Sequence, residues 1–225
     1  MVIEKITKVT LRQKVYEQLR ANILGAELLP GEVISLRGLA EKFGVSILPV
    51  REAVWQLESE NIVVVESNKR IQVNHLTSSE FKEILSIRLL LESEAINKAC
   101  QLRPRKAVSK VEQIFKAMEK HAGTNDRAYI RKNDEFHKAI YSYANSPLLI
   151  NLIQRQLARV NPYLFLYAIK QRDLTKALAC HRDILDGFAE GSSENAVAAL
   201  HRDLETAAKL ILPELEKEDR KRLKS

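Results

Sequence analysis

The stretch from residue 35 to residue 60 constrains the fold of this chain more than any other. Apolar residues at helical spacing predict a short helix over residues 35–43 and a second helix over residues 47–60. Between them, Gly44 can take the positive φ angle of a tight turn, and Ser46 is a favourable N-cap for the second helix. Two short helices across such a turn predict a helix-turn-helix, whose second helix can enter the major groove of DNA.

A β-hairpin is expected directly after the second helix. Residues 62–65 and 71–73 are rich in β-branched side chains, and the polar segment 66–70 separates them. A hairpin in this position is the wing of a winged helix-turn-helix. An amphipathic helix over residues 10–24 is predicted to precede the motif.

From residue 78 onward the periodicity of apolar residues is helical, and no strand is expected. The expected helices cover roughly residues 78–101, 104–121, 126–145, 147–169, 171–190 and 193–215, and residues 214–225 are expected to form a frayed helix end. The short connections predict an all-helical antiparallel bundle. The chain is therefore predicted to be mostly α, with a winged helix-turn-helix domain at 1–76 and a helical domain at 77–225.

The composition indicates a globular protein without a membrane span. No apolar run approaches the ~20 residues needed to cross a bilayer, and residues 1–10 lack the apolar core of a secretion signal. Cys100 and Cys180 lie far apart in helical patterns, which indicates two reduced thiols and a cytoplasmic location. The net charge is +7, but residues 1–75 hold ten Lys and Arg against nine Asp and Glu. DNA binding therefore depends on where particular basic side chains point, and not on bulk charge.

Three segments of the first domain closely resemble the DNA-binding domain of the GntR family of bacterial transcription regulators. They are Leu-Pro-Gly-Glu at 29–32, Leu-Ala at 39–40 and Val-Ser-x-x-Pro-Val-Arg-Glu-Ala at 45–53. The resemblance implies that Arg37 and Arg51 lie at the DNA surface. Bidentate binding of arginine to guanine is the commonest base-specific contact.

Further DNA contacts are expected in the turn and at the wing tip. Ser46 could cap the second helix and also reach a phosphate, and Lys69 and Arg70 are placed to contact a groove or a phosphate. The chain departs from the family at two positions, because Ile47 stands where a basic residue is usual and Arg70 where glycine is common. Ile47 either removes one contact or packs on a thymine methyl group, so the operator sequence is left open. The alternative for all these cations is that they are ordinary solvated side chains.

The second domain resembles the ligand-sensing FCD domain of the FadR-type branch of the GntR family. The matching pieces are Arg88-x-x-x-Glu92, Phe136-His137-x-x-Ile140, Ala144-Asn145-x-Pro147, His181-x-x-Ile184-Leu185 and Ala196-x-x-x-Leu200 with Leu204. The bundle of this family often holds a divalent metal. Its ligands are an Asp four residues before a His and one His on each of two later helices, and His137 and His181 match two of these positions.

The other two ligand positions differ from the family pattern. Asn133 stands four residues before His137 on the same helical face, whereas Asp134 is rotated by about 100°. On the last helix, Asp203 lies beside the apolar inward face and His201 points away from it. The predicted metal ligands are Asn133, His137, His181 and Asp203, with His201 as the alternative to Asp203. This set suits Zn²⁺, Mn²⁺ or Ni²⁺; the alternative is that the histidines only satisfy hydrogen bonds in the core.

Arg88 and Glu92 have the spacing of a pair of neighbours on one helical face. One interpretation is an intrahelical ion pair. The other, favoured by the resemblance, is that Arg88 faces the cavity and binds a ligand carboxylate in bidentate fashion. The implied effector is a small organic acid, and Tyr163 and Tyr167 are further candidates for the cavity wall.

These features predict a ligand-responsive transcription regulator and not an enzyme. A homodimer would place two recognition helices on the half-sites of a palindromic operator in double-stranded DNA. Effector binding would shift the balance between DNA-competent and incompetent arrangements, with relief of repression as the expected sign. One alternative is a metal-dependent enzyme of small acids with an appended DNA-binding domain. Another is a chromatin-like protein that binds DNA without sequence preference, which requires a larger basic excess in the first domain.

Overall fold

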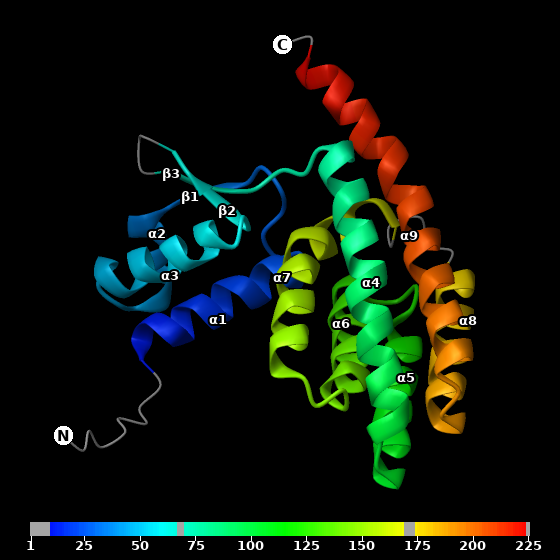
Figure 1. The fold of residues 1–225 in the computed structure, drawn as a ribbon. Helices are drawn as coiled ribbons and strands as arrows, with labels where there is room; N and C mark the ends of the chain where they lie inside the picture. The colour runs from blue at the N-terminus through cyan, green and yellow to red at the C-terminus, as the bar shows by residue number, and fades with distance from the viewer. Residues whose placement is uncertain (1–9, 67–69, 169–173, 224–225) are drawn as a thin grey trace, which may run out of the picture. The chain divides into compact units, whose positions relative to one another are not determined.

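The computed structural model describes residues 10–66, 70–168 and 174–223 of the 225-residue chain. The chain divides into two compact units, Met1–His75 and Leu76–Ser225. In Figure 1 the labelled strands belong to the first unit, and the described part of the second unit consists of helices and their connections. No helix in these described ranges is both long enough and apolar enough to cross a membrane.

The first unit combines helices with a small antiparallel sheet. Its elements are α1 (Leu11–Leu24), β1 (Val33–Ser35), α2 (Leu36–Phe43), α3 (Ile47–Ser59), β2 (Val63–Val65) and β3 (Arg70–Val73). The strand order is β1-β3-β2, so the hairpin of β2 and β3 confirms the predicted wing. Strand β1 was not predicted. A run of three residues carries no clear periodicity, and its extended conformation depends on pairing with β3.

Local capping determines the turn between α2 and α3. The Ser35 hydroxyl oxygen accepts a hydrogen bond from the backbone N–H of Gly38, and Gly44 ends α2 in the left-handed conformation with φ of 63°. Ser46 occupies the N-cap position of α3, but its side chain makes no capping hydrogen bond. Helix α3 buries Val50 and three further apolar residues, which leaves its opposite face exposed to solvent.

The second unit is a helical bundle. Its elements are α4 (Ser78–Leu102), α5 (Arg105–His121), α6 (Asp126–Ser142), α7 (Pro147–Tyr163), the π-helical segment η1 (Leu164–Ala168), α8 (Thr175–Glu190) and α9 (Ser193–Arg222). Helix α9 packs against both α8 and α4, and α5 packs against α6 (Figure 1). The side chains of Thr77 and Glu80 form the predicted capping box at the start of α4. This packing brings the inward faces of α4, α6, α8 and α9 together.

Helix α9 extends further than the sequence predicted. The expected frayed end is helical up to Arg222, and Leu215 is completely buried in an apolar cluster. The carboxylate of Asp219 accepts a hydrogen bond of 2.8 Å from the backbone N–H of Ser78. This contact joins the last turns of α9 to the first turn of α4, which local charge alternation could not reveal.

Helix α7 is shorter than predicted, because the chain changes from α-helical to π-helical winding after Tyr163. Pro162 lies inside the helix. Proline has no N–H to donate and its ring crowds the preceding turn, so regular α-helical bonding is interrupted there. Single π-helical turns of this kind frequently lie next to functional sites.

Helices α8 and α9 approach each other closely at Gly187, which leads to a prediction. In the variant Gly187→Ala, the added Cβ would lie 2.6 Å from the backbone nitrogen of Ala196. We expect a loss of about 1–3 kcal/mol in the free energy of unfolding, which exceeds the gain of about 1 kcal/mol from better helix propensity. Urea denaturation measures the difference. The double variant Gly187→Ala/Ala196→Gly should not recover stability, since the clash is with backbone; wild-type stability in Gly187→Ala would contradict the close approach.

Candidate functional site

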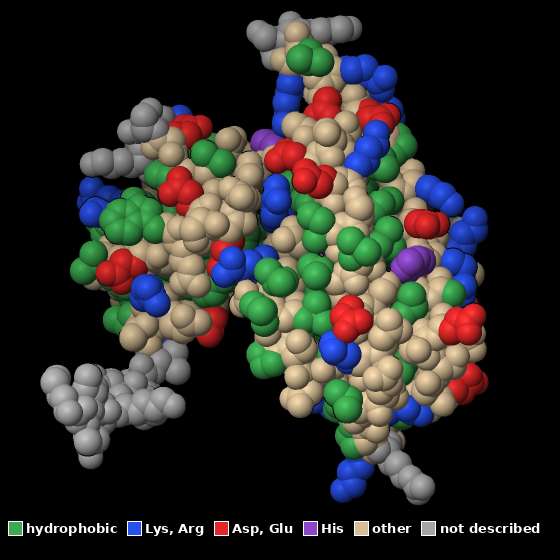
Figure 2. Space-filling model, in the orientation of Figure 1, with side chains coloured by type: hydrophobic (Ala, Val, Ile, Leu, Met, Phe, Trp, Pro, Cys, Tyr) green, Lys and Arg blue, Asp and Glu red, His purple; other side chains and the backbone are tan. Residues whose placement is uncertain are grey.

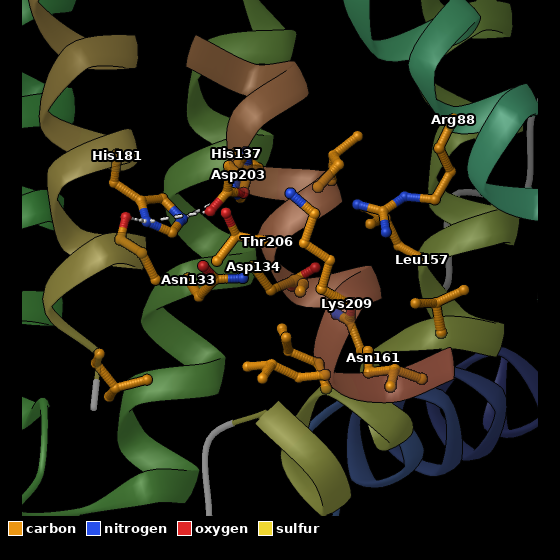
Figure 3. A pocket seen from close by; sticks show the side chains of 18 of the residues that line it. Arg88, Asn133, Asp134, His137, Leu157, Asn161, His181, Asp203, Thr206 and Lys209 are labelled. Carbon is orange, nitrogen blue, oxygen red and sulfur yellow. Dashed lines mark hydrogen bonds and ion pairs between the residues drawn. The ribbon is translucent and has the colours of Figure 1, made fainter. Parts of the chain in front are cut away.

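Helices α4, α6, α7, α8 and α9 surround a cavity of about 340 Å³ in the second unit (Figure 3). Pockets that bind small molecules have volumes of about 300–1,000 Å³. Apolar side chains such as Leu157 and Leu204 form part of the wall, and charged or amide side chains form the rest. The cavity is therefore large enough for a small polar molecule.

One end of the cavity holds two histidines and an aspartate from three different helices. His137 of α6, His181 of α8 and Asp203 of α9 are all buried. The Nε2 atoms of the two histidines are 3.1 Å apart. The Asp203 carboxylate lies 3.6 Å from His137 Nε2 and 3.7 Å from His181 Nδ1. One possible ligand atom from each residue lies within 4.8 Å of the others, and we call this group the HHD cluster.

The outer ring nitrogens of both histidines have hydrogen-bonding neighbours. His181 Nδ1 lies 2.6 Å from the carbonyl oxygen of Ala177, which can only accept, so this nitrogen carries the proton. The Tyr141 hydroxyl donates its proton to Glu92 at 2.5 Å and lies 3.3 Å from His137 Nδ1. With the proton of His137 on Nδ1, this hydroxyl accepts from it and both Nε2 atoms carry lone pairs that face each other. With the proton on Nε2, His137 donates to His181 instead.

This arrangement suits a bound cation. The two Nε2 atoms, 3.1 Å apart, can share one proton in a hydrogen bond or bind one cation together. Tetrahedral coordination at Zn–N distances of about 2.0–2.1 Å separates two ligand nitrogens by about 3.3 Å. Burial and the neighbouring His181 lower the pKa of His137 to about 3, so the imidazole stays neutral, as a metal ligand must. Two imidazole nitrogens and one carboxylate fit a divalent first-row metal.

The remaining candidate ligands differ in their relation to the HHD cluster. Asn133 is buried one helical turn before the α6 histidine and lines the cavity. Asp134 also lines the cavity, but its carboxylate pairs with Lys138 at 2.6 Å and is not part of the cluster. His201 is elsewhere, because its Nε2 lies 2.9 Å from the hydroxyl of Ser93. Of the two candidates on α9, Asp203 is the one beside the two buried histidines.

Arg88 and Glu92 form a buried ion pair on α4, with Arg88 Nε 2.6 Å from Glu92 Oε1. The Glu92 side chain has no exposed surface. Burial by itself would lower the pKa of Arg88, but the attraction of Glu92 raises it, so the guanidinium remains charged. Arg88 also lines the cavity. The ion pair and the cavity position, which the sequence posed as alternatives, are therefore both present.

Several polar side chains of the cavity did not stand out in the sequence. They include Asn161 on α7, Lys176 on α8, and Thr206 and Lys209 on α9. Thr206 and Lys209 follow Asp203 in steps of three residues, and this helical spacing is a signal that could have found them. Asn161 lies four residues after Leu157 on α7, so helical spacing places both residues on the cavity face.

The tyrosine candidates for the cavity wall are not supported. Tyr163 packs in an apolar cluster instead, and its hydroxyl accepts a hydrogen bond of 2.6 Å from the backbone N–H of Leu76. The side chain of Tyr167 lies outside the described part of the chain. Tyr163 is therefore part of this apolar cluster and not one of the residues that line the cavity.

The candidates for DNA binding lie in the first unit. Arg51 is exposed on α3, and Arg37 on α2 has a side chain that is 84 % exposed and pairs with an acid one turn later. Ser46 is exposed at the start of α3, and Arg70 is exposed at the start of β3. Lys69 lies outside the described residues.

The exposed face of α3 is more apolar than basic. Arg51 is the single basic residue in its sequence. Ile47, Leu48 and Trp55 are 41 %, 59 % and 57 % exposed, respectively. Leu48, Arg51 and Trp55 follow one another at helical spacing, so they share one face of α3.

Comparisons with known proteins agree with this architecture. The family model of bacterial regulatory proteins of the gntR family matches residues 11–73, and the FCD domain model matches residues 83–206. An uncharacterized HTH-type transcriptional regulator of Bacillus subtilis, YdhC, is 31 % identical over 141 residues, which span 62 % of this chain but only 63 % of YdhC. The gluconate operon transcriptional repressor of the same organism is 24 % identical over 209 residues, or 89 % of this chain and 84 % of that protein.

The HTH-type transcriptional regulator McbR of Escherichia coli is similar in sequence and in structure. It is 29 % identical over 165 residues, which cover 72 % of this chain and 75 % of McbR. The solved structure of McbR matches with a TM-score of 0.86 at 25 % identity, over 92 % of this chain and 99 % of that one. These relatives are transcription regulators, so they give no support to the enzyme alternative. The chain therefore belongs to the GntR family of bacterial transcription regulators, and its helical unit contains an FCD domain.

Proposed function

We propose that this protein is a homodimeric regulator whose DNA binding responds to a small organic acid held beside a divalent metal. The observation that carries the proposal is the pair of buried Nε2 atoms of His137 and His181, 3.1 Å apart at one end of a cavity. Two such imidazole nitrogens can bind one metal ion, and a metal ion with open coordination positions attracts carboxylates. Binding in the helical unit would change the population of DNA-competent states of the protein.

The proposed metal ligands are Asn133, His137, His181 and Asp203, and Zn²⁺, Mn²⁺ and Ni²⁺ suit this set. When bound, the metal would supply a Lewis acid for a carboxylate oxygen. Arg88 would contact the same ligand from α4. Because the ion pair with Glu92 already holds the guanidinium in place, little side-chain entropy is lost when the remaining N–H groups donate to a ligand.

For DNA binding, Arg51 would make the base-specific contact from α3. Arg37, Ser46, Lys69 and Arg70 would contact the backbone or an adjacent groove. Because the exposed face of α3 carries apolar side chains around Arg51, contacts to thymine methyl groups would supply further base recognition. This supports a sequence-specific regulator, since non-specific binders depend on a large basic excess.

A second copy of the chain would cover an apolar surface of α4 and α7. Leu90 and Leu148 are 74 % and 73 % exposed, and Ile87 and Leu152 are also exposed, one turn away on the same helices. Figure 2 shows hydrophobic side chains over this face of α4 and α7. Clustered apolar side chains on a surface commonly mark a protein interface. A twofold dimer would match a palindromic operator, and the named gluconate operon repressor supports repression as the sign of control.

The first prediction from this proposal concerns DNA. The substitution Arg51→Ala should weaken binding to a selected operator by about 5- to 100-fold, because one bidentate base contact contributes roughly 1–3 kcal/mol. Fluorescence anisotropy with duplexes enriched from a random library measures this. Lys14→Ala, which removes an exposed cation from α1, is the matched control. Equal losses in both variants would indicate bulk electrostatics and contradict the assigned contact.

The second prediction concerns the metal. Protein dialysed against Zn²⁺ should retain about one ion per chain and melt at a higher temperature, because a ligand that binds only the folded state stabilises it. The variant His137→Ala/His181→Ala should lose both effects. His201→Ala should keep them, because His201 bonds to Ser93 outside the HHD cluster. Metal analysis by mass spectrometry and thermal denaturation provide the readouts; retention of metal by the double variant would refute the site.

The third prediction concerns the support of Arg88. Arg88→Met should cost about 3–5 kcal/mol of unfolding free energy, because it leaves the buried charge of Glu92 without its partner. The double variant Arg88→Met/Glu92→Leu should recover most of this loss, since both charges are then removed. Urea denaturation compares the two. If the single variant is as stable as the double variant, the ion pair is not the feature that holds Arg88.

A further inference from the structure

The first turn of α3 exposes apolar side chains at the end of the helix that meets the bases. Ile47 and Leu48 are 41 % and 59 % exposed, and the N-terminal residues of a recognition helix contact base edges in the major groove. We propose that Ile47 and Leu48 form a site for the 5-methyl groups of pyrimidines, so that the protein distinguishes thymine and 5-methylcytosine from bases without this group. The inference rests on the proposed function, which places Arg51 at a base, and it names the side chains that read the adjacent bases.

Helical geometry makes both apolar side chains neighbours of Arg51. Ile47 is the first residue of α3 and lies four residues before Arg51, and Leu48 lies three residues before it. Residues three and four apart are adjacent on the surface of a helix. All three side chains are exposed, whereas the opposite face of α3 is buried. When Arg51 binds one base, Ile47 and Leu48 therefore face the base pairs beside it.

The chemistry of the major groove decides what these two side chains recognise. Isoleucine and leucine have no hydrogen-bonding group, and the base edges in this groove carry donors, acceptors and the methyl group at C5 of thymine. An apolar side chain that covers a donor or an acceptor removes its water without providing a partner, which is unfavourable. Contact with a methyl group has no such penalty and removes apolar surface of both partners from water. A pyrimidine with a 5-methyl group is therefore the base that Ile47 and Leu48 favour.

The low positive charge of α3 favours base contacts of this kind over phosphate contacts. Arg51 is the single basic residue of the helix, and residues 1–75 hold ten Lys and Arg against nine Asp and Glu. Affinity that comes from phosphate contacts requires many cations. A helix with one cation must obtain more of its affinity from the bases themselves, and the apolar side chains next to Arg51 are placed to contribute it.

Trp55 belongs to the same exposed face and reports on it. It lies four residues after Arg51 and seven after Leu48, and it is 57 % exposed. Because it follows Leu48 by about two turns, we expect it near the edge of the groove, where sugar and phosphate groups lie. It is also the single tryptophan of the chain. Its fluorescence therefore measures whether this face of α3 loses water when DNA binds.

The test compares duplexes that differ by single methyl groups. It uses the full-length protein and an operator enriched from a random library, in which each thymine of one half-site is replaced in turn by uracil. Uracil pairs in the same way as thymine and lacks only the methyl group. At the positions that Ile47 and Leu48 contact, we expect the replacement to weaken binding roughly 4-fold, as the loss of one buried methyl-sized group implies.

A second arm of the test uses cytosine at the same positions. A C·G pair should bind weakly there, and 5-methylcytosine should bind more tightly than cytosine by about the same factor that separates thymine from uracil. Fluorescence anisotropy of labelled duplexes measures the affinities. The emission of Trp55 should shift to shorter wavelength when unlabelled operator binds.

Variants of the exposed side chains assign the contact. Ile47→Ala and Leu48→Ala should each remove the sensitivity to uracil at one position and keep it at the other. Leu11→Ala, which shortens a leucine of α1 that is 57 % exposed, is the matched control and should keep both sensitivities. Because all three side chains are exposed, we expect the variants to fold as the wild-type protein does, which thermal denaturation checks.

The outcomes separate this inference from the proposed function. Operator binding that is weakened by no uracil would overturn the methyl site and leave the base contact of Arg51 intact. Unchanged emission of Trp55 at saturating operator would overturn it as well. If Leu48→Ala alters the oligomeric state but not the sensitivity to uracil, the surface belongs to a protein contact and the inference is wrong. If Arg51→Ala also leaves the operator affinity unchanged, the proposed base contact fails together with the inference.

Discussion

The hydroxyl of Tyr141 joins the ion pair of α4 to the histidines inside the helical unit. Tyr141 donates its proton to Glu92 and lies 3.3 Å from Nδ1 of His137, whose Nε2 faces His181. Glu92 in turn holds Arg88. A short chain of hydrogen bonds thus connects the arginine of α4 with the histidines of α6 and α8. A change at either end alters the polar groups available at the other, since buried donors and acceptors must remain paired.

The first unit carries the DNA-binding motif but has almost no net positive charge. Its helix α3 exposes Arg51 among apolar side chains, whereas proteins that bind DNA without sequence preference depend on many phosphate contacts. A single arginine surrounded by apolar side chains favours contacts with particular bases, and it attracts the DNA backbone less strongly than many cations would. The extra strand β1 extends the sheet of the wing by pairing with β3.

Most of the fold could be predicted because its elements carry local signals. Gly44, the capping pair of Thr77 and Glu80, and the apolar periodicity of the helices each act within a few residues. The errors have two causes, which are contacts with distant parts of the chain and a proline inside a helix. Strand β1 depends on a partner far along the chain, the end of α9 is held by the contact of Asp219 with Ser78, and the end of α7 reflects the conflict between Pro162 and its surroundings. None of these long-range or strained features leaves a periodic pattern.

The sequence by itself determined which side chains face inward, because helical spacing and family motifs place His137, His181 and Asp203 on the inner faces of three helices. Only the tertiary structure decided how close they come and which groups their nitrogens face, since both depend on Tyr141 and on the backbone of a neighbouring turn. It also decided that Lys209 borders the same cavity. Periodicity indicates the direction in which a side chain points from its own helix. The distances between helices depend on how they pack, and they cannot be predicted from the periodicity of one sequence.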